Sequence, residues 1–528
     1  MKNSCFTLCF ILFALLLFNS SKAQNDFELN YKMLWNNHNI ENKVVAKVGN
    51  INITAKEFFL NYVFGPAFVK RKPNSKQKYL DFMIYEKLLA IEGYEKQFNN
   101  DKEVKLILND VEGDLSSELY YRKNIWDKIN ISESDINSAV LKEQSNINIK
   151  WIFTKNEAVA RNSYISIKAQ STFDSLFNEQ FNDTTVKVEN RELQTTLFKL
   201  ERDNPKLVQI ISQLKSGEIA NPVKVNDGWY ILQLVNKYNT PILTESEINT
   251  LKEKVKNILI QERADSSANI FVNNLILETN PIIQRKTFNI LRYAIASKFL
   301  SPEKIDELEI KSANYPSFSK ISNNYNDVLI KAKDGNVLIK DFLNWYYTRE
   351  PYVKFDFSSH KSYDLSLQQI VWRMYRDYLL VKESSKSKFT DQEEIKEELK
   401  FWQDKLVYQK VKLELAGSID FSLEKLKDYY IKNPNNYKDN NGKLLDFETV
   451  KDNVKNDYTS DEFRKLFVHK FLALKQKYKI TIDDKLLKDI VVDEENNPKA
   501  IEVYPVKKGG TFPRIIYPSI DREWQFFD

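Results

Sequence analysis

The stretch GEIANPVKVNDGWYILQL occupies residues 217–234 and decides how the middle of the chain folds. Its first half places Gly217 and Pro222 before two valines, which predicts a turn followed by a short strand. The Asp-Gly pair at 227–228 favours a hairpin turn, and the aromatic and β-branched run after it is typical of a strand. We therefore expect a turn, a strand, a hairpin and a closing strand.

The residues before this stretch complete a small α+β domain. Residues 148–153, NIKWIF, have the composition of a strand, and the pattern from Asn156 to Phe181 predicts a helix. A second, shorter helix is expected near 205–214. The order β-α-α-β-β predicts one domain over residues 146–238.

The residues on either side are predominantly helical and repeat one pattern. Residues 44–58, VVAKVGNINITAKEF, predict a strand, a turn and a helix that begins at Thr54 with Glu57 three residues on. The same order returns from residue 328, without the inserted domain. We therefore expect an α+β chain, predominantly α, in which a helical module is duplicated and one copy carries the β-α-α-β-β domain.

The expected division of the 528 residues follows from these patterns. The predicted segments are a signal peptide (1–23), a first helical module (24–145), the α+β domain (146–238), a long helix and connector (239–321), a second helical module (322–432), a C-terminal helical segment (433–490) and a Pro- and aromatic-rich tail (491–528).

The N-terminus has the pattern of a cleavable secretory signal. Lys2 precedes an apolar run from Cys5 to Phe18, and Ser21-Lys22-Ala23 places small residues where a signal peptidase reads them. The run is shorter than the roughly 20 residues that a membrane-spanning helix needs. We expect cleavage after Ala23 and a periplasmic location, with no stable membrane insertion.

Cleavage removes both cysteines of the chain, so the mature protein has no thiol for a disulfide, a nucleophile or a metal site. It also removes Lys2 and Lys22 and no acid, which lowers the formal net charge from +5 to +3. So small a charge predicts no nucleic-acid partner. The acidic clusters lack the spacing of metal loops, and neither a metal nor a cofactor is expected.

Three features together resemble the SurA-like family of periplasmic chaperones and parvulin-type peptidyl-prolyl isomerases. They are the signal peptide, the opening VVAKVGNINITAKEF, and the Gly-x-Ile-x-x-Pro-Val segment with its Gly-aromatic-x-Ile strand. The resemblance covers about residues 40–280, and 325–483 as a second copy without the parvulin domain. It implies a parvulin-like fold for the inserted domain, and clients in transit to the outer membrane.

The resemblance also implies where a catalytic site lies. The family has one histidine at the opening of the first strand and one in the last, and these positions fall on Trp151 and Tyr230 here. Asp183 lies near the family's acidic position. We expect Leu197, Phe198 and Leu207 to line an apolar substrate pocket. Residues 146–238 contain neither His nor Cys, so this site departs from the family pattern.

Two interpretations of the site remain open: a prolyl isomerase that works without histidines, or a parvulin-like fold that binds peptides, in which Trp151 and Tyr230 are core aromatics. For the whole chain, three functions compete. The first is a chaperone for unfolded or extended polypeptides, with outer-membrane or secreted proteins as the expected clients. The second is an active isomerase, and the third is a non-catalytic subunit of an envelope assembly. The tail either packs on the body or docks a partner.

Overall fold

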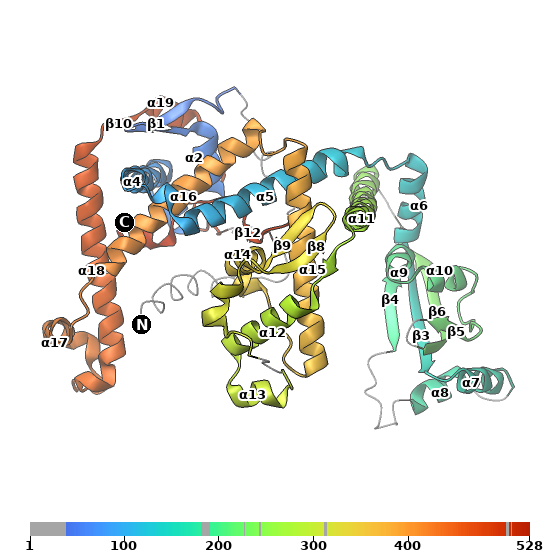
Figure 1. The fold of residues 1–528 in the computed structure, drawn as a ribbon. Coiled ribbons are helices and arrows are strands. Elements are labelled where there is room, and N and C mark those ends of the chain that lie inside the picture. The colour runs from blue at the N-terminus through green and yellow to red at the C-terminus, as the bar shows by residue number, and fades with distance from the viewer. Residues whose placement is uncertain are drawn as a thin grey trace. The chain divides into compact units, whose positions relative to one another are not determined.

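The computed structural model describes residues 39–169, 172–180, 191–225, 228–241, 244–310, 314–502, 506–507 and 509–527. The signal peptide predicted at residues 1–23 lies outside them. The chain divides into two compact units, one of residues 121–271 and one of residues 1–120 together with 272–528. Helices predominate over small antiparallel sheets (Figure 1), which confirms the predicted mainly helical α+β class. The finer domain boundaries stay predictions.

The unit of residues 121–271 is built around a four-stranded antiparallel sheet of order β4-β3-β6-β5. Its helix α6 begins after Ser132, whose hydroxyl accepts from the amide of Asp135 at 3.1 Å. The elements are η3 (Trp126–Lys128), α6 (Glu133–Gln144), β3 (Ser145–Thr154), α7 (Glu157–Ala169), α8 (Phe173–Glu179), β4 (Glu192–Thr196), α9 (Leu197–Asp203), α10 (Pro205–Ile211), β5 (Val223–Val225), β6 (Gly228–Asn239) and α11 (Glu245–Thr279), the last of which continues past the unit.

The predicted order β-α-α-β-β is wrong in three respects. It omits β4, an edge strand of sequence ELQTT whose one large apolar side chain, Leu193, is 37% exposed, so no alternation marks it. The expected helix from 156 to 181 is two helices, α7 and α8. Helix α9 was likewise not expected; it ends at Asn204, which caps α10 just before Pro205.

The larger unit contains two three-stranded sheets and the long helices. Its elements are β1 (Val44–Val48), β2 (Ile51–Thr54), α2 (Ala55–Val63), α3 (Ala67–Lys70), α4 (Ser75–Glu95), η2 (Phe98–Asn100), α5 (Lys102–Asn124), β7 (Ile282–Ile283), α12 (Arg285–Phe299), α13 (Pro302–Glu307), η4 (Phe318–Asn324), β8 (Val328–Ala332), β9 (Gly335–Leu338), α14 (Ile339–Arg349), η5 (Glu350–Tyr352), α15 (His360–Lys386), α16 (Glu393–Gly417), α17 (Leu423–Lys432), η6 (Pro434–Tyr437), α18 (Phe447–Lys477), β10 (Ile480–Ile482), α19 (Asp484–Asp489), β11 (Val506–Lys507), β12 (Arg514–Ile515) and η7 (Arg522–Phe527).

The two three-stranded sheets of this unit join segments that are far apart in the sequence. Each contains a hairpin, β1-β2 or β8-β9, followed by a helix. Strand β10, which follows α18, pairs with β1, and β7, which follows α11, pairs with β8. Each hairpin therefore takes its third strand from the end of a long helix elsewhere in the chain. The order of elements after the two hairpins is alike, while the duplication itself stays a prediction.

The long helices of this unit cross between the two predicted copies. Helix α16 packs along α4, and α5 packs against α15 and α16. Both crossings need glycine, because a Cβ at Gly93 would lie 2.3 Å from Val407 and one at Gly113 would lie 2.8 Å from Val381. Helices of one predicted copy therefore pack against helices of the other, so the two copies do not fold as separate domains.

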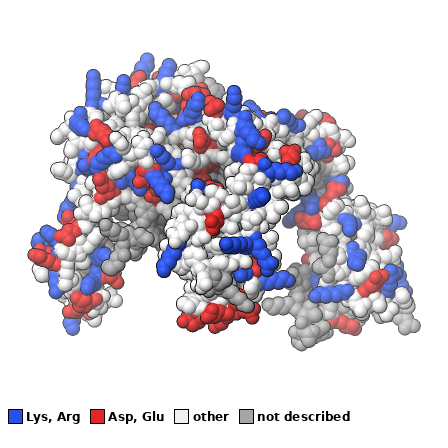
Figure 2. Space-filling model, in the orientation of Figure 1, with Lys and Arg blue, Asp and Glu red and all other residues white. Residues whose placement is uncertain are grey.

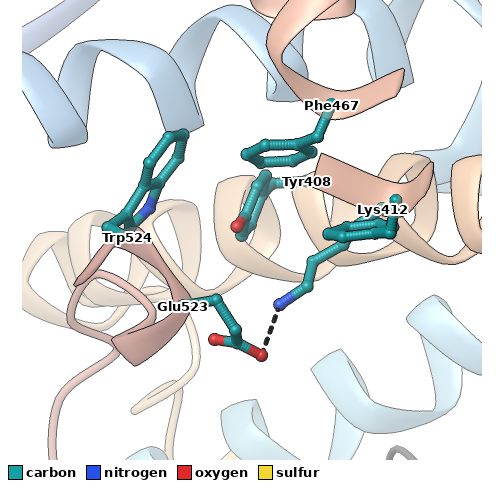
Figure 3. Close-up of a pocket in the computed structure, with 6 residues that line it drawn as sticks. Tyr408, Lys412, Phe467, Glu523 and Trp524 are labelled. Atoms are coloured by element: carbon teal, nitrogen blue, oxygen red, sulfur yellow. Dashed lines mark hydrogen bonds and ion pairs between the residues drawn. The ribbon is translucent and has the colours of Figure 1, made fainter. Parts of the chain in front are cut away.

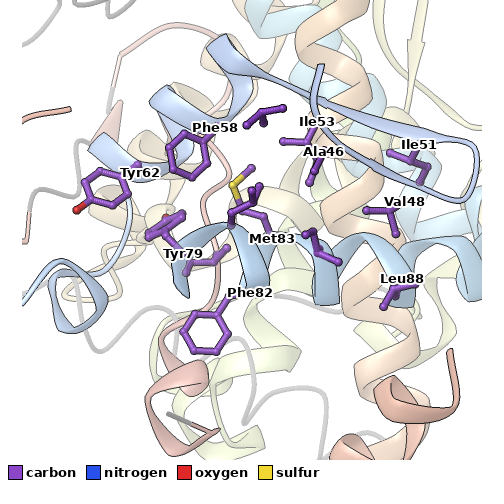
Figure 4. Packing of buried hydrophobic residues seen from close by; sticks show 14 of the residues in the cluster. Ala46, Val48, Ile51, Ile53, Phe58, Tyr62, Tyr79, Phe82, Met83 and Leu88 are labelled. Carbon is purple, nitrogen blue, oxygen red and sulfur yellow. The ribbon is translucent and has the colours of Figure 1, made fainter. Parts of the chain in front are cut away.

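The main core of this unit lies where the first hairpin meets α2 and α4 (Figure 4). Thr54 begins α2 as expected, since its hydroxyl accepts from the Glu57 amide at 3.1 Å. The side chains around Phe58, Tyr79 and Met83 are almost fully buried and pack closely (Figure 4). Within the described part of the chain, no helix is both long and apolar enough to cross a membrane.

Candidate functional site

Trp151 and Tyr230, the positions implied by resemblance, lie on the same face of the four-stranded sheet. Trp151 is on β3 opposite Leu232 of β6, and Tyr230 is opposite Phe153, so all four side chains point to one side. The rings of Phe153 and Tyr230 lie 5.1 Å apart with planes at 58°. Trp151, Phe153 and Tyr230 are half-buried. We call these three side chains the aromatic face.

The inner part of the same face is a closed core. Ile147, Ile149 and Leu234 are almost fully buried beneath α9 and α10, and Leu197 and Leu207 belong to the same cluster. Trp151 and Tyr230 of the aromatic face pack against that cluster. Leu197 and Leu207 therefore support Trp151 and Tyr230 from below, and their predicted role in binding substrate stays a prediction.

Of the other predicted site residues, Phe198 is described by the structure and Asp183 is not. Phe198 lies on the other side of α9, where it packs with Ile136 and Val140 of α6 and Val255 of α11. Neighbours on a helix point about 100° apart, so Phe198 and Leu197 belong to different clusters. The predicted role of Phe198 in lining a substrate pocket stays a prediction. Asp183 lies outside the described residues.

Arg191, which was not predicted from the sequence, lies beside the aromatic face. It stands just before β4, and its carbonyl oxygen accepts from the Trp151 amide at 3.1 Å. Its guanidinium lies over the Phe153 ring, 5.6 Å from the centroid, and donates to the side-chain oxygen of Gln180. The Gln180 amide in turn donates to the Trp151 carbonyl at 3.3 Å. Burial lowers the pKa of Arg191 from its ordinary value.

The backbone beside the aromatic face leaves no room for a side chain at Gly228. A Cβ there would lie 2.6 Å from the Phe153 ring and 2.8 Å from the Thr154 carbonyl oxygen. The glycine of the Asp-Gly pair thus lets β6 approach β3 closely enough for Tyr230 to reach Phe153.

This arrangement favours binding over acid–base chemistry. Aromatic rings and one guanidinium provide apolar contact and hydrogen-bond donors, which suit an extended polypeptide. No imidazole or thiol lies in residues 146–238, so the usual neutral-pH proton carriers are missing from the sequence of this domain. The Tyr230 hydroxyl is the one acidic proton that the aromatic face offers.

The tail, for which two roles were open, packs on the larger unit. Trp524 is 1% exposed, its ring stacks on Phe82 at 5.2 Å, and its indole N–H donates to Glu86 at 3.0 Å. Figure 3 shows Trp524 beside Phe467 and Tyr408, with the Lys412 ammonium paired to Glu523 at 3.0 Å. The described tail residues thus fill a site on their own unit, which supports packing over docking.

The charged side chains outside these sites are mixed in sign. On the face seen in Figure 2, lysines and arginines lie among aspartates and glutamates over the described residues. Recognition on that face therefore does not rest on a surface of one charge.

No family model matches the sequence, but parts of the chain are similar to proteins named as foldases and parvulin-like PPIases. The chain is 27% identical over 128 residues to foldase protein PrsA of Clostridium botulinum, covering 24% of this chain and 37% of the relative. It is 24% identical over 195 residues to a parvulin-like PPIase of Rickettsia felis, covering 36% of this chain and 68% of the relative. The chain thus spans little more than a third of the PrsA foldase.

Solved structures give a weaker likeness. The peptidyl-prolyl isomerase PrsA of Bacillus anthracis is 19% identical, with a TM-score of 0.21, over 28% of this chain and 70% of that one. Foldase protein PrsA of Streptococcus pneumoniae is 16% identical, with a TM-score of 0.22, over 42% of this chain and 86% of that one. TM-scores this low support no inference about the function of the chain.

Proposed function

We propose that this chain is an exported, periplasmic folding factor of the parvulin type that binds unfolded envelope or outer-membrane polypeptides, mainly as a chaperone. The observation that carries the proposal is the sequence match to proteins named foldase and parvulin-like PPIase. The signal-peptide pattern at residues 1–23 supports export, and the resemblance to SurA-like chaperones supports the choice of clients.

The aromatic face supports holding as the main activity. Trp151, Phe153 and Tyr230 are half-buried, so each keeps part of its ring surface accessible to an apolar client segment. Apolar contacts of this kind do not depend on the exact sequence of the client, which suits a protein that binds many unfolded clients. A chaperone of this kind needs no covalent step and no proton transfer.

The direct test uses aggregation of an unfolded client. A porin-type protein diluted from urea scatters light as it aggregates, and we expect an equimolar amount of the mature chain, residues 24–528, to suppress most of that signal. An equal mass of albumin serves as the control. Equal scattering with either protein, together with co-purification of one stable partner, supports the envelope-subunit alternative instead.

Prolyl isomerisation is the second candidate, and the match to a parvulin-like PPIase favours it. The rotation barrier is roughly 18–20 kcal/mol, and lowering it requires groups that weaken the amide resonance in a dry site. Because the two histidine positions hold Trp151 and Tyr230, we expect the mature chain to leave the isomerisation rate of a proline peptide at its uncatalysed value.

A protease-coupled peptide assay measures that rate, with the Tyr230→Phe variant as the matched control for the hydroxyl. A rate enhancement that the wild-type chain shows and Tyr230→Phe loses contradicts the expectation and establishes an isomerase that works without histidines.

A further inference from the structure

Arg191 is a buried cation for which the described residues provide no carboxylate partner. The residue is 9% exposed, and its guanidinium contacts the neutral Gln180 amide oxygen and the Phe153 ring and interacts electrostatically with Tyr230. A buried charge is costly unless an opposite charge and hydrogen bonds compensate it. The contacts of Arg191 supply only part of that compensation.

The other two buried arginines among the described residues show the usual arrangement. Arg349, 2% exposed, pairs with Asp110 at 3.1 Å, and Arg514, 5% exposed, pairs with Asp114 at 2.9 Å. Arg191 differs from both because its guanidinium faces an aromatic ring and an amide. Among the described residues, the Arg191 guanidinium therefore has no anion of the kind that Arg349 and Arg514 have.

The surroundings of Arg191 indicate which anion fits. The guanidinium fork matches a carboxylate, to which it can donate two parallel hydrogen bonds. The Phe153 ring beneath it and the adjoining Trp151 and Tyr230 offer an apolar surface within the same few ångströms. A ligand that uses both parts carries a carboxylate next to an apolar group.

We propose that Arg191 makes the aromatic face selective for client segments in which an aspartate or glutamate side chain adjoins an apolar residue. The carboxylate pairs with Arg191, and the neighbouring residue lies on Phe153 and Tyr230. This selectivity rests on the proposed peptide-binding function and names the client chemistry that the site prefers.

The test is fluorescence anisotropy with the full mature chain and labelled peptides, acetylated and amidated, that are identical except for Glu or Gln beside an apolar residue. We expect the Glu peptide to bind about ten-fold more tightly, as for one charge-assisted contact. Arg191→Gln removes the preference. Arg161→Gln, at a 65% exposed side chain of the same unit that pairs with Glu157, keeps it.

Each other result counts against the proposal in its own way. Equal binding of the two peptides by the wild-type chain overturns the role of Arg191 and leaves peptide binding intact. Binding of neither peptide overturns both the selectivity and the proposed function. A third peptide, with Gln and a free C-terminal carboxylate, checks the source of the anion: tight binding of that peptide alone overturns the assignment to side chains.

Discussion

Replacing Asp114 by Asn is expected to lower the free energy of unfolding of the larger unit by about 3–5 kcal/mol, because it breaks a buried ion pair on one side only. The Asp114 side chain is fully buried and accepts from Arg514 at 2.9 Å and from Lys507 at 3.1 Å. It also accepts from the amides of Thr511 and Phe512 at 3.0 and 3.2 Å. Asparagine keeps the shape of the side chain but not its charge, so Arg514 stays buried without its closest negative charge.

Urea unfolding followed by tryptophan fluorescence measures the change, and Glu307→Gln is the matched control. Glu307 pairs with Lys304 while 62% exposed, so its loss should change stability by no more than about 0.5 kcal/mol. An Asp114→Asn midpoint equal to that of Glu307→Gln contradicts the assignment of the tail to the folded body.

The effect of Asp114 should also depend on pH. Burial by itself raises the pKa of this carboxyl, but the charges of Lys507 and Arg514 hold it below its ordinary value. A carboxyl with a depressed pKa stabilises the fold above its unfolded-state pKa and loses that contribution as the pH falls through the folded-state pKa. The difference between wild type and Asp114→Asn should therefore shrink below about pH 4.

Replacing Trp524 by Ala is expected to cost about 3–5 kcal/mol in the same unit, since it empties a filled aromatic site. The indole stacks on Phe82, lies 5.1 Å from the Phe467 ring, and donates to Glu86. The change leaves both a cavity and a buried carboxylate that has lost a donor.

Gln525→Ala is the control, because the neighbouring glutamine is exposed. Thermal unfolding of the two variants and the wild-type chain gives the comparison. If Trp524→Ala melts with Gln525→Ala at the wild-type temperature, the tail does not contribute to the core and its role as a docking segment returns.

The parts of the fold that sequence reasoning recovered depend on local chemistry. Thr54 caps the helix that was predicted to begin there, because this cap involves only residues that are three apart in the sequence. The hairpin between β5 and β6 was predicted from one Asp-Gly pair, and the two strands are paired in the structure. Patterns of this kind require no knowledge of the rest of the chain.

The parts that it missed depend on distant partners. Strand β4 has no apolar alternation, and only its pairing with β3 makes it a strand. Strand β10 pairs with β1 from more than 400 residues away, and Asp114 meets Arg514 only after the tail has packed. Arg191 was overlooked for the same reason, because its burial against Phe153 and Gln180 arises only when the sheet has formed.

We propose above all that this chain recognises polypeptides in the unfolded state. The most direct measurement is the affinity of the mature chain for one porin-type client, labelled once, presented unfolded after dilution from urea and folded in detergent. We expect saturable binding to the unfolded client, at least about ten-fold tighter than to the folded one. Equal affinity for both forms, or no binding to the unfolded client, would contradict it.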